Sequence, residues 1–474
     1  MRNKHLNPLA LIVYMIRFAK IAWFVLLPLL FQHLSILTVL IVLGIIVLYA
    51  LSQYIPFTYS ILPNELVIKS GLIVCKVRHI PYERIQSVQR KQWFYLRPFG
   101  IEELIIENAS NSSEEQTVNL PAVGTSIAPE LERRQLVATH HENDQPSESP
   151  KPLQYRIKDS DMFVFGITGV NVVAEFFVII ALLDRLNVAL TPEIGRLKFL
   201  FNSITMIITS VVSVVIILMA IGVIKTFVRF YGFTVTKQAD HLLIEKGLLQ
   251  RKTYNIPLAK VQGVDFTQNI VRYWFHLTTV QLRLITNAKD DDSIGVVTIM
   301  PVIKQQQAFE MINRLTGIVP QQAPTMKRGD AYSKWLFVRN ALLIALPMMA
   351  LIMIAIYQIH SVVWNWAILG ISALVIAFLI VNGIYKGSVT AVKQISADQV
   401  ALQSSRRLLK RLTIVNWHQI QSVNYRQSIW MLKTKRAHLE LSIRSGTQAR
   451  KFKYRYLPQS DVQQIFEWYR DFVK

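Results

Sequence analysis

Charge-free stretches alternate with polar segments along the chain. Four stretches hold at most one Asp, Glu, Lys or Arg: residues 21–64, 162–183, 199–224 and 340–385. The first and the last are each long enough to cross the ~30 Å hydrocarbon core of a bilayer twice as α-helix. We therefore expect six transmembrane helices in three hairpins, the first two being Lys20–Phe31, extended by its flanking residues, and Leu34–Tyr54.

Short apolar or alternating runs, with turn residues between them, fill the polar segment after each hairpin. Examples are Leu66–Ile68, Leu72–Val77 and Ile101–Ile106, which have the period of half-buried strands. Helical patterns follow Pro301 and Pro458. Each segment thus predicts an α+β unit, a β-barrel or sandwich of six or seven short strands closed by one C-terminal helix.

The three polar segments repeat one another. Residues 80–92 read IPYERIQSVQRKQ, residues 256–268 read IPLAKVQGVDFTQ, and residues 415–427 read VNWHQIQSVNYRQ. Two glutamines, six positions apart, recur in every copy: Gln86 and Gln92, Gln262 and Gln268, Gln421 and Gln427. Agreement at so many positions with fixed offsets indicates a threefold internal repeat.

This arrangement resembles the bacterial PH-domain membrane proteins of the YdbS/YdbT-like type, with three tandem bacterial PH domains. The resemblance rests on the motif I-P-x-x-[RK]-[IV]-Q-[SG]-V at 80–88 and 256–264, and on the Gly-Leu pairs at 71–72 and 247–248. The third copy departs from the motif, with Asn416 in place of proline. The resemblance implies a PH-like fold, a bacterial cytoplasmic membrane and no known enzymatic reaction, and it transfers no ligand or binding residue.

The repeat and the charge-free stretches together predict the domain order. The expected parts are 1–56 with helices 1–2, 57–129 as PH-like domain 1, 130–160 as a polar flexible linker, 161–226 with helices 3–4, 227–325 as PH-like domain 2, 326–385 with helices 5–6, and 386–474 as basic PH-like domain 3. The short turns inside the first and third hairpins lack Lys and Arg. The positive-inside rule therefore predicts a multi-pass protein of the bacterial cell membrane, with both termini and the PH-like domains in the cytoplasm.

Positive charge is concentrated in the last segment. The 474 residues carry a net charge of +22; residues 386–474 hold seventeen basic against five acidic residues, whereas residues 57–125 hold seven of each. The basic clusters are Arg406, Arg407, Lys410 and Arg411, then Lys433, Lys435 and Arg436, and then Arg450, Lys451, Lys453 and Arg455, of which the first and the last are the candidate membrane-surface residues. They suit docking on anionic lipid headgroups, at about 1 kcal/mol per basic residue near the surface. The alternative is a generic solvated face of a positive-inside protein.

Two sets of polar residues leave a functional and a structural interpretation open. Glu175 falls midway along the third expected helix, where a carboxylate costs about 2.5–3.5 kcal/mol and has either a partner or a function. It would serve a proton or ion relay, or it would hold helices together by hydrogen bonds, with Asn202 or Asn382 as candidate partners. The paired glutamines either line a recognition groove or bridge backbone groups at a barrel corner.

Signatures of common enzymes are absent from the sequence. It has no Gly-rich phosphate loop, no G-x-S-x-G, no H-E-x-x-H and no C-x-x-C. Asp290-Asp291-Asp292 suits a hairpin turn, His140-His141 lies in the polar linker, and the single cysteine, Cys75, suits a small strand residue. We therefore expect no enzymatic activity, no cofactor and no metal site.

These features favour a non-enzymatic integral membrane protein that holds three PH-like domains at the inner leaflet. It would act as a lipid- or protein-binding scaffold, with a role in envelope protection against membrane-active agents. The alternative is a transporter or channel component that uses Glu175 as an intramembrane ionisable group. Expected partners are membrane lipids, above all anionic ones, and either a membrane protein or further copies of the chain. Because the basic segment is tethered to the membrane, we expect no nucleic-acid partner.

Overall fold

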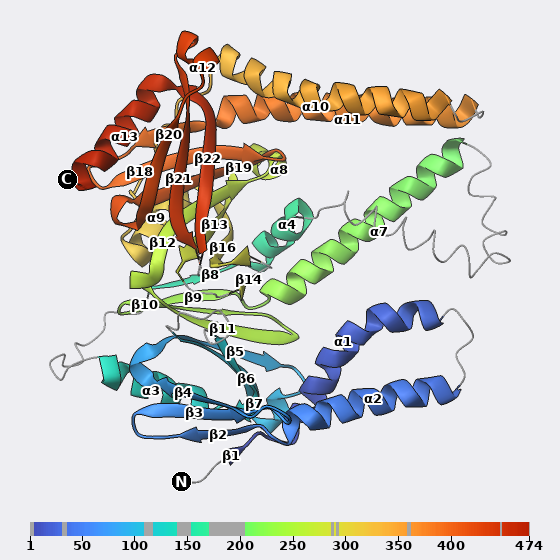
Figure 1. The fold of residues 1–474 in the computed structure, drawn as a ribbon, viewed down its shortest axis with the longest axis vertical. Helices are drawn as coiled ribbons and strands as arrows, with labels where there is room; N and C mark the ends of the chain where they lie inside the picture. The colour runs from blue at the N-terminus through green and yellow to red at the C-terminus, as the bar shows by residue number, and fades with distance from the viewer. Residues whose placement is uncertain are drawn as a thin grey trace. The chain divides into compact units, whose positions relative to one another are not determined.

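The computed structural model describes residues 4–30, 36–108, 117–139, 153–169, 204–285, 289–290, 293–357, 362–445 and 448–473 (Figure 1). The chain divides into two compact units, Met1–Leu258 and Ala259–Lys474. The polar breaks expected near Gln32 and Gln358 lie outside the described residues, as do residues 170–203 of the expected middle hairpin.

The first unit consists of two antiparallel sheets with helices at their ends. Its elements are β1 (Lys4–His5), α1 (Ala10–Leu30), α2 (Ile36–Tyr54), β2 (Thr58–Ile61), β3 (Glu65–Ser70), β4 (Lys76–Pro81), η1 (Tyr82–Arg84), β5 (Ile85–Trp93), η2 (Arg97–Phe99), β6 (Ile101–Asn108), β7 (Thr117–Gly124), α3 (Ile127–Thr139), β8 (Gln154–Arg156), α4 (Asp159–Gly169), α7 (Ile204–Phe230), β9 (Thr234–Gln238), β10 (His241–Lys246) and β11 (Gln250–Pro257). The sheet orders are β1-β2-β3-β4 and β7-β6-β5-β11-β10-β9-β8. Part of the expected linker at 130–160 is therefore regular structure, and its residues 140–152 lie outside the described part.

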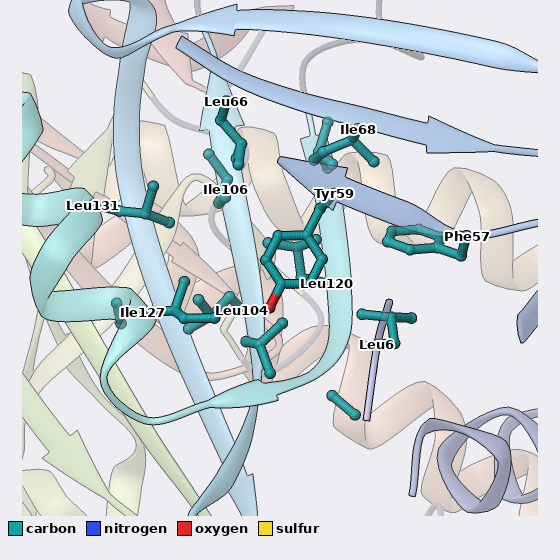
Figure 2. Packing of buried hydrophobic residues seen from close by; sticks show 14 of the residues in the cluster. Leu6, Phe57, Tyr59, Leu66, Ile68, Leu104, Ile106, Leu120, Ile127 and Leu131 are labelled. Carbon is teal, nitrogen blue, oxygen red and sulfur yellow. The ribbon is translucent and has the colours of Figure 1, made fainter. Parts of the chain in front are cut away.

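The core of repeat 1 lies between the four-stranded sheet and strands β5, β6 and β7. Leu66 of β3, Leu104 of β6 and Leu120 of β7 have no exposed surface, and Leu131 of α3 packs onto the same cluster (Figure 2). Every second residue of a strand points to the same face, so each strand contributes alternate apolar side chains to this core. The helix after the last strand closes the core, as the pattern in the sequence predicts.

The second unit repeats this construction and carries the longest helices. Its elements are β12 (Val261–Gln268), α8 (Ile270–Trp274), β13 (Leu277–Leu284), β14 (Lys289–Asp290), β15 (Ser293–Ile294), β16 (Val296–Lys304), α9 (Gln305–Thr316), α10 (Ala331–Tyr357), α11 (Val362–Val389), β17 (Ala391–Gln394), β18 (Gln399–Arg406), β19 (Leu409–Asn416), η5 (Trp417–Gln419), β20 (Ile420–Arg426), α12 (Ile429–Lys433), β21 (Arg436–Ser445), β22 (Gln448–Pro458) and α13 (Gln459–Val473), while η4 (Leu258–Lys260) spans the unit boundary. The sheet orders are β15-β14-β16-β13-β12-β19-β18-β17 and β20-β21-β22. Leu402 of β18, Leu439 of β21 and Val462 of α13 meet in the core of repeat 3.

Two sheets continue from one repeat into the next. In the first unit β5 of repeat 1 pairs with β11 of repeat 2, and Gln89 lies opposite Tyr254. In the second unit β12 of repeat 2 pairs with β19 of repeat 3, and Asp265 lies opposite Thr413. The register is the same at both junctions, because Asp265 has the repeat position of Gln89 and Thr413 has that of Tyr254. Each repeat was expected to form a β-barrel or sandwich closed by its own helix, but two of the sheets are shared between neighbouring repeats. A neighbouring repeat covers a strand edge as barrel closure would.

The expectation of six transmembrane helices in three hairpins is also wrong. Within the described residues, two helical stretches are long and apolar enough to cross a membrane, Ala331–Ile354 of α10 and Ser372–Val389 of α11. Leu40–Tyr54 of α2 is apolar but shorter. The charge-free run at 21–64 overstated its helical length, because from Ile55 onward it forms a turn and strand β2. Absence of charge does not distinguish helix from the turn and strand that follow it.

The helices α10 and α11 lie side by side (Figure 1), and glycines let their backbones approach closely where α10 begins and α11 ends. A Cβ atom at Gly383 would lie 3.1 Å from the Cα of Val338, and one at Gly387 would lie 2.5 Å from the Cα of Lys334. Small residues four positions apart let helix backbones approach closely, which is how apolar helices associate in a bilayer. The two candidate membrane helices therefore form one tightly packed hairpin.

Candidate functional site

The turn between β18 and β19 presents two of the predicted basic residues beside α11. Arg407 and Leu408 have φ angles of 52° and 62°, as the primed two-residue hairpin turns require. The Leu408 N–H donates to the side-chain oxygen of Asn382 in α11 over 3.2 Å. Arg406 and Arg407 are exposed. The turn is thus fixed to the last part of a candidate membrane helix with both guanidinium groups facing solvent.

Lys410 and Arg411 point to opposite faces of β19, as adjacent strand residues must. Burial and the positive charge of Arg328 lower the pKa of Lys410. The Nε atom of Arg411 lies 3.7 Å from a carboxylate oxygen of Asp265, which is buried. Both side chains are half-buried, so they offer less surface for docking than Arg406 and Arg407 do.

Several guanidinium groups gather around the single carboxylate of Asp265. Arg283 is 1% exposed and donates from Nε to Asp265 over 2.9 Å, and the Thr413 hydroxyl donates to the same oxygen over 2.7 Å. Burial, followed by the positive charges of Arg283 and Arg411, lowers the pKa of Arg450. Both Arg283 and Arg450 lie over the ring of Phe452, at 4.7 and 5.8 Å from its centroid.

Lys451 and Lys453 lie near a second buried carboxylate, that of Glu440. Arg426, which is not among the predicted surface residues, lies near the same carboxylate. Their ammonium nitrogens lie 3.9 and 3.8 Å from Glu440, and an Arg426 guanidinium nitrogen lies 3.9 Å from it. Glu440 is 4% exposed, whereas all three basic side chains are largely exposed. Three positive charges thus surround one negative charge on this face of the sheet β20-β21-β22.

A cavity of about 420 Å³ opens at the start of α10. We call it the α10 pocket, and its lining consists of Tyr332, Leu336, Arg339, Arg426, Gln427, Ser428, Trp430, Met431, Thr434, His438 and Tyr456. Arg339 and Arg426 bring two exposed guanidinium groups to it. Trp430 is 80% exposed, an unusual position for a large aromatic ring in a water-soluble domain but an ordinary one at a membrane interface. The pocket therefore combines positive charge, apolar surface and a place beside a candidate membrane helix.

His438 sits in this pocket as a neutral hydrogen-bond acceptor. The backbone N–H of Tyr456 donates to its Nδ1 atom over 3.1 Å. Burial and the nearby positive charge of Arg455, another of the predicted basic residues, lower the pKa of His438. Protonation would place a hydrogen on Nδ1 and remove the acceptor of the Tyr456 N–H, so this hydrogen bond also favours the neutral imidazole.

Arg436 fixes the pocket wall to the start of α10. It forms an ion pair with Asp330, and its Nη1 atom donates to the Ser333 hydroxyl over 2.8 Å. Burial would raise the pKa of Asp330, but hydrogen bonds from Ser333 and Arg436 hold it below its usual range. This arginine belongs to a basic cluster in the sequence, yet it is 9% exposed and is committed to this contact.

The paired glutamines hold strand ends in all three repeats. The second glutamine of each copy donates to a backbone carbonyl nine residues further on, from Gln92 to Ile101, from Gln268 to Leu277 and from Gln427 to Arg436, over 3.3, 2.9 and 2.8 Å. The first glutamine of each copy, at 86, 262 and 421, falls at the register shift that opens the strand. This geometry is that of the structural interpretation, with the amides at strand corners.

Other residues singled out in the sequence do not join these surfaces. Glu175 and its suggested partner Asn202 lie outside the described residues, as do His140-His141. Asp290 lies opposite Ser293 in the short hairpin of β14 and β15, with the next two residues of the acidic run outside the described part. Cys75 lies in an exposed turn before β4 rather than in a strand, because Gly71, with φ of 102°, reverses the chain.

The sequence did not point to the α10 pocket, because its residues come from segments that are distant along the chain. Arg339 lies at the edge of a charge-free stretch, and His438 lies in a strand. The nearest signal was Trp430, an aromatic residue three positions after the second glutamine of repeat 3, which lies in the short helix α12.

Known proteins resemble the chain along most of its length. The bacterial PH domain matches it three times, at residues 16–138, 175–317 and 341–473. The chain is also similar to the UPF0699 transmembrane protein YdbT of Bacillus subtilis (strain 168), with 23% identity over 439 residues that cover 87% of this chain and 85% of that protein. Each matched segment contains one copy of the paired glutamines, so these matches confirm the resemblance that rested on the repeat.

Proposed function

Because the chain belongs to the bacterial PH domain family, as a YdbT-like membrane protein with three copies of the domain, we propose that it binds anionic phospholipid headgroups at the α10 pocket. The protein would act without catalysing a reaction. Its three repeats would form a scaffold at the cytoplasmic face of the bacterial cell membrane, anchored by α10 and α11.

The α10 pocket is the observation that supports this proposal. Arg339 and Arg426 approach it from different elements, so a phosphate between them would meet two guanidinium groups. The nearest carboxylate to Arg426 is 3.9 Å away and is shared with two lysines. Trp430 offers an exposed aromatic surface of the kind that settles at headgroup level. A cavity of about 420 Å³ is within the range of ligand sites.

The turn at Arg406 and Arg407 would strengthen binding without belonging to the pocket. The turn is fixed to α11, whose last part packs against the first turns of α10 through Gly387 and Lys334. Both the turn and the α10 pocket therefore adjoin the same end of the helix hairpin. Each exposed basic residue near an anionic surface contributes about 1 kcal/mol, an effect that salt screens.

The test uses the full chain purified in detergent and titrated with short-chain phosphatidylglycerol or phosphatidylcholine. A ligand at a hundred times its Kd stabilises the folded state by about 2.7 kcal/mol, which thermal unfolding detects. We expect phosphatidylglycerol to raise the unfolding temperature and phosphatidylcholine to leave it unchanged. Arg339→Gln together with Arg426→Gln should remove the response. Lys304→Gln together with Arg314→Gln, two exposed residues at α9 of the same unit, is the matched control and should retain it.

Two outcomes would contradict the proposal. Equal stabilisation by both lipids would show that acyl chains rather than headgroups bind. An unchanged response in the Arg339 and Arg426 variant would move the site elsewhere. Arg406→Gln with Arg407→Gln should weaken binding and reduce its salt dependence, because these residues contribute long-range attraction only.

Orientation and cellular role form separate parts of the proposal. A reporter fused after Lys474 should be active in the cytoplasm, and an external signal would exclude headgroup binding at the inner leaflet. A scaffold whose exposed basic residues lie beside the hairpin would cover anionic lipid, and protection of the envelope is the role that we propose for it. A strain that lacks the protein should then be more sensitive to cationic membrane-active peptides, and the Arg339 and Arg426 variant should fail to restore resistance.

A further inference from the structure

Two strands lie at sheet edges although their equivalents in other repeats are paired. β4 ends the sheet β1-β2-β3-β4, and β20 ends the sheet β20-β21-β22. The strands at the position of β4 in repeats 2 and 3 are β11 and β19, which pair with β5 and β12 of the preceding repeat. β5 and β12 in turn hold the position of β20. Within the described residues, β4 and β20 are thus the complementary halves of a junction that the chain forms twice internally.

The internal junctions specify how these halves would align. Both junctions use one register, with Gln89 opposite Tyr254 and Asp265 opposite Thr413. Asn424 has the repeat position of Asp265, and Arg78 has that of Tyr254. The same register therefore sets Asn424 of β20 opposite Arg78 of β4. With this register, side chains that face the same side of the sheet lie opposite one another along the whole strand.

Basic residues on β4 do not exclude such pairing. Charged residues on an edge strand usually prevent contact with other edges, and β4 carries Lys76 at one end. At the first internal junction, however, Lys91 lies opposite Lys252 in a formed sheet. The shared register places Arg426 opposite Lys76 at this same position. Two basic residues would thus face each other, as Lys91 and Lys252 do in the sheet inside the chain.

Uncovered apolar residues flank both edges. Ile73, in the turn before β4, is 95% exposed, and Ile429, directly after the β20 edge, is 76% exposed. Their counterparts at the first junction are in contact, since the Phe94 N–H donates to the Leu249 carbonyl over 2.7 Å. Ile73 and Ile429 thus have the repeat positions of Leu249 and Phe94, which are in contact inside the chain.

We propose that a second copy of the chain adds its β4 edge to β20, head to tail, and so continues the repeat array between molecules. The contact is heterologous, because different surfaces of the two copies meet, and it can extend to further copies. Backbone hydrogen bonds would supply its direction and the register would supply its specificity. The inference does not rest on lipid binding at the α10 pocket, although Arg426 belongs both to the β20 edge and to the pocket lining.

Disulfide cross-linking in native membranes tests the register. Two differently tagged full chains, both Cys75→Ser, are co-expressed, one with Arg78→Cys and the other with Asn424→Cys. Residues directly opposite in an antiparallel pair have Cα atoms about 4.5–5.5 Å apart, within disulfide range, so mild oxidation should link the two tags. Moving the second cysteine from Asn424 to Tyr425 turns it to the other face, and this matched control should yield roughly tenfold less product.

Three results would overturn the proposal. Links between two Arg78→Cys chains would indicate a symmetric contact, and an internal disulfide in a chain that carries both cysteines would indicate pairing within one molecule. Absence of linked product, with thermal unfolding of the reduced variants unchanged from the parent, would show that the edges do not meet. In that last case, labelling of Ile73→Cys by a lipid-soluble reagent would show that the apolar turn is covered by lipid instead.

Discussion

Asp265 is the carboxylate that joins three strands from two repeats. It accepts hydrogen bonds from Arg283 of β13 and Thr413 of β19, and both Asp265 and Arg283 are 1% exposed. Asp265→Asn should lower the free energy of unfolding by about 3–5 kcal/mol, because it leaves the buried Arg283 charge without its partner. Chemical unfolding of the full chain in detergent, followed by tryptophan fluorescence, measures the change.

Thr413→Val provides the graded comparison at the same site. It removes one neutral donor and leaves the ion pair, so it should cost about 1 kcal/mol. If the two variants lost equal stability, the Asp265–Arg283 ion pair within repeat 2 would contribute no more than the Thr413 hydrogen bond that crosses from β12 to β19.

His438 makes stability depend on pH. Burial and Arg455 lower its pKa, so the unfolded chain takes up a proton at a higher pH than the folded chain. Stability is therefore fully present above the unfolded pKa of about 6.5 and is lost as pH falls through the lower folded pKa, by at most about 1.4 kcal/mol per pH unit. Thermal unfolding between pH 7.5 and 5.5 should show this decline.

The matched variant is His438→Asn, whose side-chain oxygen can still accept the Tyr456 N–H. It should remove part of the decline and leave stability at pH 7.5 nearly unchanged. A pH dependence identical to that of the parent would assign the effect to other histidines.

The sequence predicted the contacts that a residue makes near itself along the chain better than it predicted sites that are assembled from distant segments. The six glutamines stood out because they repeat, and each second glutamine bonds to the backbone nine residues on. The basic residues stood out by charge, but charge does not reveal that Arg411 faces Asp265 while Arg406 faces solvent. Those directions depend on strand pairing, which sequence spacing alone does not supply.

At the scale of elements, the α10–α11 hairpin depends on close backbone contact. Gly387→Ala should separate the helices, because the added Cβ would lie 2.5 Å from the Cα of Lys334, and overpacking costs about 1–3 kcal/mol. Gly370→Ala in the same helix is the control, since nothing lies within 4 Å of that Cβ. Thermal unfolding in lipid nanodiscs should show a loss for Gly387→Ala alone, and equal effects would contradict glycine-mediated packing.

Element type was predictable, whereas element ends were not. The strands, and the helix that closes each repeat, follow from apolar periodicity. The expected strand Leu72–Val77 is instead a turn up to Cys75, because Gly71 adopts a left-handed conformation. The helix expected at Pro301 begins at Gln305, since β16 runs through the proline to Lys304.

At the scale of the molecule, repeat boundaries and folding boundaries differ. The first compact unit ends at Leu258, after β11 has covered the edge of β5. A fragment of residues 1–258 should therefore give a monodisperse particle in detergent, with slow hydrogen exchange at the amides of β5. A fragment of residues 1–139 contains all of repeat 1 but leaves that edge open, so it should self-associate. Equal behaviour of the two fragments would show that the shared sheet is not required.

The threefold repeat and the family were evident from the sequence, but the shared sheets were not. A repeat signal reports that units have the same strands. It does not report whether the last strand of a sheet bonds within its own unit or with the next one, because the side-chain pattern of a covered edge is similar in both cases. Within the described residues, fewer helices are long and apolar enough to cross a membrane than the six expected. At residues 21–64 the reason is related, because a charge-free run does not mark where helix gives way to strand.

The shared sheet also means that β5 is synthesised well before β11, the strand with which it pairs. Gln250 of β11 follows Trp93 of β5 by 157 positions, which a ribosome covers in about 8–30 s at 5–20 residues per second. Throughout that interval the outer edge of β5 has left the ribosome without its partner strand. Nascent chains on one messenger carry the same open edge at the same time, so neighbouring ribosomes supply the strand most able to occupy it. We therefore expect the yield of correctly assembled protein to fall when translation slows in the segment between β7 and β11.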